Sequence, residues 1–131
     1  MNWVIHFDEV KRLVFVNASG AIERLPLRQM SEEVRNAVVQ HGPKGVLIDY
    51  SRAVPRLEPY EIFERPKVLT EIGFPADVKV AVVFSLLDEN TQFLENVYQN
   101  KHFPVRVFAD QTEALSWLQQ SGPDLTKGSL N

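Results

Sequence analysis

Apolar runs along the chain alternate with segments of helical periodicity, beginning with two strand-like runs. Residues 3–7 and 12–18 are rich in valine, isoleucine and aromatic residues, and the charged segment 8–11 between them predicts a β-hairpin. Positions 13–16 are apolar one after another, which predicts a strand covered on both faces. The first run mixes in polar residues, and this pattern favours a strand at the edge of a sheet.

Three further apolar runs, residues 45–50, 78–85 and 104–109, predict short buried strands. The first of them ends in an acidic and an aromatic residue and is followed by the polar segment 51–57, which we expect to be a loop. Short apolar strands separated by helical patterns are typical of a parallel sheet.

Two predicted helices lie between these strands. Apolar positions recur at helical spacing from residue 27 to 41, and Gly42 with the proline after it predicts the end of that helix. Glu58 and Pro59 predict the start of the next helix, because proline in the first turn loses no needed donor. Pro66 inside that segment predicts a kink or a restart.

Two more helices are expected near the C-terminal end. Asp88 predicts an N-cap, and Asp110 with Glu113 predicts a capping box at the start of the last helix. Gly122 and the following proline predict the end of that helix. We therefore expect residues 1–121 to form one domain and residues 122–131 to form a flexible tail.

The fold class that follows is α/β, with a β-hairpin start followed by four β-α units. Crossovers between parallel strands are right-handed, so the five-stranded, mostly parallel sheet is expected to wind as a β-α superhelix with its first strand antiparallel at one edge. Ligands of open α/β sheets bind at the carboxyl ends of the strands. That rule nominates the segments 17–21, 49–57, 85–88 and 109–110 as rim loops.

The amino-acid composition excludes several classes of function but does not assign one. The 131 residues are 44% apolar and carry a formal net charge of −3, which offers no field for nucleic acid. With no cysteine, three poorly spaced histidines and no glycine-rich phosphate loop, we expect no metal, no cofactor and no nucleophilic enzyme. No apolar run reaches the length of a membrane span, and a cytoplasmic location is the default expectation.

Several of these segments together resemble a known family. The strand end Val46 to Ser51, the strand 80–84 and the closing segment 108–118, with its Ala-x-x-Trp-Leu ending, are similar to the SpoIIAA-like group of the STAS (anti-sigma factor antagonist) fold. The resemblance covers residues 1–120 and implies the SpoIIAA-like β-α superhelix. It also implies a non-catalytic regulatory or protein-interaction module.

The chain departs from that family at its phosphorylation site. In the anti-sigma factor antagonists a serine in an Asp-Ser-Ser-Gly motif opens the helix after this strand, whereas this chain reads Leu57-Glu58-Pro59-Tyr60 there. The phosphorylation switch is therefore not carried over. Glu58 is expected to be a helix-start carboxylate that complements the helix dipole, although a fixed negative charge in place of the phosphate is the alternative.

Two groups of residues are candidates for binding. Asp49 at the strand end, with two arginines in the following segment, could form an anion clamp or serve as a general base, but a carboxylate bonded to its own loop is the simpler interpretation. The apolar residues around the second helix favour core packing, with a partner surface or a lid as alternatives. The candidate binding residues are Asp49, Ser51, Arg52, Arg56, Glu58, Tyr60 and Phe63.

Two functions from different classes fit this pattern. The first is an interaction module that contacts a protein partner or a second copy of itself. The alternative is a binder of a small apolar or anionic ligand at the strand carboxyl-end rim, since the STAS fold resembles the CRAL-TRIO lipid-binding domains, where the same superhelix floors an apolar cavity. A chain of this length leaves room for only a small pocket, or for one shared across a dimer.

Overall fold

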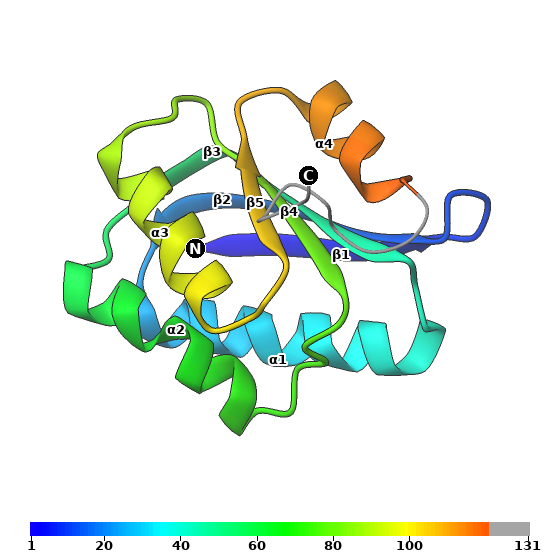
Figure 1. The fold of residues 1–131 in the computed structure, drawn as a ribbon, viewed down its shortest axis with the longest axis horizontal. Helices are drawn as coiled ribbons and strands as arrows, with labels where there is room; N and C mark the ends of the chain where they lie inside the picture. Colours follow the sequence, from blue (N-terminus) through cyan, green and yellow to red (C-terminus); the bar gives the residue numbers. More distant parts are fainter. Residues whose placement is uncertain (121–131) are drawn as a thin grey trace, which may run out of the picture.

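The computed structural model describes residues 1–120, which form a five-stranded sheet with helices on both faces (Figure 1). The strands are β1 (Asn2–Asp8), β2 (Leu13–Ile22), β3 (Gly45–Pro55), β4 (Lys79–Val83) and β5 (Val105–Phe108), and they lie side by side in that order. The helices are α1 (Arg24–His41), α2 (Pro59–Glu71), α3 (Glu89–Asn100) and α4 (Gln111–Leu118). β1 is the antiparallel edge strand and the other pairs are parallel, which confirms the predicted fold class.

The hairpin between β1 and β2 is held by local hydrogen bonds and by α1. The N–H groups of Val10 and Lys11 each donate to the Asp8 carboxylate at 2.9 Å, and the bond from Lys11 lowers the pKa of Asp8 below its ordinary value. Arg12 lies in the left-handed region (φ 59°) and its side chain donates to the carbonyl of His41 at 3.0 Å. The turn is therefore tied to the C-terminal end of α1.

Two hydrophobic cores result, one on each face of the sheet. Alternate residues of the central strands point to opposite faces. Val14, Val46 and Val82 therefore pack with α1, α2 and α3, while Leu13 and Leu47 pack under α4. Figure 1 shows α1 and α4 on opposite sides of the sheet. Both faces of β2 are covered, as its uninterrupted apolar run predicts.

The strands β2 and β3 extend farther than the sequence pattern indicates. Residues 17–21 and 51–55, expected as rim loops, are strand, and Ser19 to Ile22 pair with Arg52 to Pro55 after a bulge near Asn17. The loop assignment was wrong because each polar segment satisfies its backbone hydrogen bonds with the other, a long-range pairing that composition does not reveal.

Local start and stop signals are reproduced with two differences. Gly42 ends α1 in the left-handed conformation (φ 55°), and the Asp88 carboxylate accepts from the N–H of Thr91 at 3.0 Å. α2 continues through the buried Pro66 as one helix, so the predicted restart does not occur. Asp110 caps α4 through the N–H of Thr112 at 2.7 Å, not through a capping box with the residue at position 113, and the predicted stop at residues 122–123 lies outside the described residues.

Candidate ligand-binding site

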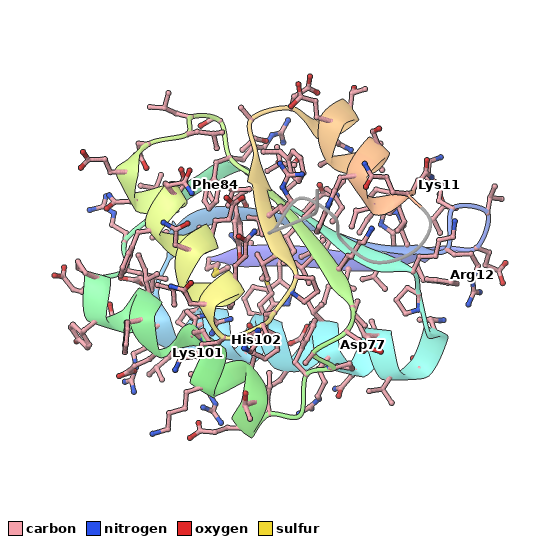
Figure 2. All side chains as sticks on the ribbon, in the orientation of Figure 1. Lys11, Arg12, Asp77, Phe84, Lys101 and His102 are labelled. Carbon is pink, nitrogen blue, oxygen red and sulfur yellow. The ribbon has the colours of Figure 1, made fainter. Side chains whose placement is uncertain are left out.

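A cavity of about 360 Å³ lies between the sheet and the three helices α1, α2 and α3. Its wall extends to the segments that follow β3 and β4, where it includes Leu57, Ser85 and Leu86. Figure 2 shows Phe84, another wall residue, near the start of α3, at the opposite end of the molecule from Lys11 and Arg12 of the hairpin turn. Most of the wall is apolar, including Leu27, Met30, Val34, Ile62, Leu69 and Phe74.

One charged side chain of the cavity wall is buried. Arg65 of α2 is only 7% exposed, and its guanidinium donates from Nε to the Tyr98 hydroxyl at 3.1 Å and from Nη2 to Ser31 Oγ at 2.6 Å. Ser31 in turn donates to the Leu27 carbonyl at 2.8 Å. The guanidinium therefore joins α1, α2 and α3 through neutral hydroxyl groups.

The positions of these polar residues follow from helical spacing. In α2, Arg65 lies three residues after Ile62 and four before Leu69, on the stripe that faces the sheet. In α1, Ser31 lies four residues after Leu27, on the buried stripe of that helix. Helical periodicity therefore carries both polar groups into the core.

Tyr50 of β3 contributes a further hydroxyl group to the cavity wall. It is buried, its ring lies 5.5 Å from that of Phe84, and its hydroxyl makes no hydrogen bond with residues 1–120. Burial raises the pKa of Tyr50 well above its ordinary value, and the positive charge of Arg65 offsets part of that rise. Tyr50 is therefore neutral at physiological pH and keeps a proton to donate.

No acidic group within residues 1–120 lies within ion-pair distance of Arg65. The neighbouring glutamates of α2 are engaged elsewhere: Glu64 pairs with Arg24 at 3.8 Å and Glu71 with Arg28 at 3.5 Å, both at the surface. Asp88 borders the cavity, and its carboxylate accepts the N–H of Thr91. The cavity thus combines apolar walls, several donors and one uncompensated positive charge.

The residues nominated from the sequence lie mainly outside this cavity. Asp49 accepts the N–H of Ser51 at 2.8 Å, the local turn that the simpler interpretation expects. Ser51, Arg52 and Arg56 are exposed, and the two arginine side chains form no ion pair or hydrogen bond with the described residues. The structure does not bring these groups together as a clamp, and a binding role for them stays a prediction.

The nominated residues of α2 are at the surface. Glu58 is the N-cap residue, as predicted, and its backbone N–H donates to Glu61 at 2.9 Å. Tyr60 and Phe63 are 63% and 65% exposed, whereas Ile62 and Leu69 are in the core. Some apolar residues of this helix therefore pack in the core, and others are exposed at the surface.

The pattern of the sequence did not indicate that Arg65, Ser31, Tyr98 and Tyr50 line a cavity. The sequence held a signal for Arg65 and Ser31, because a charged or hydroxyl residue at a core position of an amphipathic helix interrupts the apolar stripe. The contact of Arg65 with Ser31 and Tyr98, each from a different helix, depends on tertiary packing and could not be predicted from spacing.

Within residues 1–120, no group of histidine and acidic side chains is placed to hold a metal ion. None of the helices in that part of the chain combines the length and the hydropathy that crossing a bilayer requires.

Comparison with known proteins gives relatives in structure only. No protein-family model and no curated protein sequence matches the chain. The structure is similar to an anti-sigma factor antagonist from Mycobacterium paratuberculosis, with a TM-score of 0.57 and 17% identity over 91% of this chain and 96% of that one. It is also similar to an uncharacterized protein with a SpoIIAA-like fold from Shewanella loihica PV-4 (TM-score 0.56, 21% identity, 89% and 92% covered).

A third structure, the anti-sigma factor antagonist SpoIIAA in its unphosphorylated form, has a TM-score of 0.52 and 12% identity, with 88% of this chain and 96% of that one covered. These likenesses give the chain a SpoIIAA-like fold, as the resemblance in its sequence implied.

Proposed function

We propose that this protein is a non-catalytic module that binds a small, largely apolar molecule between its sheet and the helices α1, α2 and α3. The observation that carries the proposal is the cavity of about 360 Å³ with mainly apolar walls and a few convergent polar groups. Ligand sites of soluble proteins have this character and start at about 300 Å³.

An uncharged probe tests the cavity by itself. We expect the fluorescent amine N-phenyl-1-naphthylamine to bind the wild-type protein at one saturable site, with a blue shift of its emission on entering an apolar space. Ala53→Phe, which adds a ring at the cavity wall, is expected to weaken binding at least about tenfold, because the ring occupies space that the probe needs. Native mass spectrometry of gently purified protein, before and after denaturation, would show any ligand carried through purification.

The control is Ala76→Phe, the same change at an exposed position between α2 and β4. Equal binding by wild type and both variants would place the probe elsewhere on the protein. No binding by wild type would contradict the proposed function.

A second function, contact with a protein partner, is favoured by a different observation. Tyr60 and Phe63 are exposed, lie three residues apart on one side of α2, and are near neighbours on the helix surface. Such exposed aromatic residues are typical of protein interfaces. The anti-sigma factor antagonists with this fold are regulators by name, and we infer that this chain has a regulatory role of the same general kind.

Site-specific photocrosslinking distinguishes a surface that binds a protein partner from one that is only exposed to solvent. A photoreactive amino acid at position 63 is expected to give a reproducible covalent adduct with one protein, or with a second copy of the chain, in the source cell. The control is position 10 in the hairpin turn, where Val10 is 91% exposed. The absence of an adduct at position 63, or the same adducts at both positions, would contradict a partner surface on α2.

A further inference from the structure

Arg65 carries a buried charge that has no acidic partner within residues 1–120. A guanidinium stays protonated at all physiological pH values, and burying a charge without a partner is strongly unfavourable. Arg65 is 7% exposed and has only the neutral oxygens of Ser31 and Tyr98 as partners. A bound anion would supply the missing countercharge.

Hydrogen-bond counting indicates which anion fits. A guanidinium has five N–H donors, and the two bonds that Arg65 makes leave three for a ligand. Ser31 gives its own proton to Leu27, so its oxygen accepts from Arg65 and holds the guanidinium in place. With the free hydroxyl of Tyr50 on the same wall, these donors suit the two oxygens of a carboxylate.

The charge balance favours a carboxylate over a phosphate. Arg65 is the one basic side chain in the cavity wall within residues 1–120, and Asp88 lies on the wall as well. A phosphate monoester carries about −1.5 to −2 charges at neutral pH, more than one arginine balances. A carboxylate carries a single negative charge.

The rest of the cavity sets the size and polarity of the ligand. At about 30 Å³ for each water-sized group, 360 Å³ holds about a dozen such groups. Most side chains around the remaining space, including Leu27, Val34 and Leu69, are apolar. This space suits a hydrocarbon body of medium length better than a polar sugar or nucleotide.

We propose that the cavity binds a monocarboxylic acid of medium chain length, with its carboxylate on the guanidinium of Arg65 and its hydrocarbon body against the apolar wall. This inference deepens the proposed function and rests on it. Arg65 then has two roles: it joins three helices and it recognises the head group of the ligand.

Calorimetry with a matched pair of ligands tests the head group. Decanoate and 1-decanol have similar chains and differ in charge, and both are used at pH 7.5 below the concentration at which they aggregate. We expect wild type to bind decanoate at least about tenfold more tightly, because a hydrogen bond to a charged group contributes about 1.5–3 kcal/mol and 1.4 kcal/mol is a factor of ten. Arg65→Met, which keeps much of the side-chain volume, is expected to bind the two ligands equally.

The control variant is Arg35→Met. Arg35 of α1 donates to the carbonyl of Ile72 at 2.7 Å and is not part of the cavity wall, so this variant is expected to keep the full preference for decanoate. An unchanged preference in Arg65→Met, or a loss of preference in both variants, would overturn the assignment of Arg65.

Wild type alone decides the question if Arg65→Met fails to fold. Equal affinity for decanoate and decanol, or no binding of decanoate by a protein that still binds the uncharged fluorophore, would overturn the carboxylate site while leaving the cavity function intact. If neither the fluorophore nor decanoate binds, both proposals fail.

Discussion

The two faces of the sheet are built from the same strands but are packed differently. Under α4, Leu13, Leu47 and Leu118 are at most 1% exposed, and a Cβ atom added to Gly45 would lie 2.8 Å from Leu118 Cδ2. On the other face, three helices cover the strands and still leave about 360 Å³ of space. One short helix closes its face more completely than three helices close theirs.

The difference lies in how closely the helices pack on the strands, and not in how many helices cover a face. Leu118 and its neighbours on α4 interdigitate with small strand residues such as Gly45 and Ala81, so close packing is available. On the open face, Arg65 and Ser31 occupy core positions where an apolar chain would otherwise fill the space. We infer that the α4 face is scaffold and the opposite face carries function.

The largest effect is expected from the same truncation made on each face. Leu118→Ala removes a 1% exposed side chain from the close-packed face and is expected to lower the free energy of unfolding by about 4 kcal/mol, through lost transfer energy and a new cavity. Leu69→Ala borders existing space, has fewer contacts to lose, and is expected to cost about 2 kcal/mol. Urea unfolding measures both, and equal losses would contradict the difference in packing.

Substitutions that add volume are expected to change the free energy of unfolding less, but they also distinguish the two faces. Ala114→Leu under α4 is expected to destabilise by about 1–3 kcal/mol because Ala114 is fully buried in a packed core. Ala53→Leu, at the cavity wall, is expected to change the free energy of unfolding by no more than about 0.5 kcal/mol, since its extra atoms enter open space. Matched destabilisation by the two variants would show that the cavity wall does not tolerate added atoms.

The smallest effect appears only at alkaline pH. The pKa of Tyr50 is raised in the folded state, so above about pH 10 the unfolded chain loses this proton while the folded protein keeps it. The stabilisation is complete below that pH and falls as pH rises, by at most about 1.4 kcal/mol per pH unit. Tyr50→Phe is expected to lose less stability than wild type between pH 9 and 11.

Guanidinium unfolding at pH 9, 10 and 11 measures this difference. Tyr60→Phe, the same loss of a hydroxyl group at an exposed position, is the control. Parallel curves for wild type and Tyr50→Phe would contradict the burial of the Tyr50 hydroxyl.

Local signals explain the parts of the fold that could be predicted. Gly42, Glu58 and Asp88 mark helix ends through the conformation or hydrogen bonding of their own neighbourhood. The apolar run at positions 13–16 likewise predicts a strand with two covered faces, and β2 has them. These inferences hold because the relevant interactions reach only a few residues along the chain.

The errors and omissions arise where distant segments meet. The segment 51–57 was expected to be a loop, but residues 51–55 are strand because residues 19–22 lie beside them and satisfy their backbone groups. The candidate site follows the same rule: the local bond of Asp49 with residue 51 agrees with the simpler interpretation, whereas the bonds of Arg65 to two other helices were not predicted. A sequence pattern predicts on which side of a helix or strand a residue lies, but not which residues of other elements it contacts.

The amino-acid sequence by itself determined the order of strands and helices, the antiparallel edge and the apolar faces, because periodicity and chain chirality fix them. Only the tertiary structure decided that Arg65, Ser31, Tyr98 and Tyr50 share one cavity wall. These residues come from three helices and one strand, and the packing of those elements sets the distances between their side chains. The electrostatics of a buried charge depend on those distances, which no local pattern encodes.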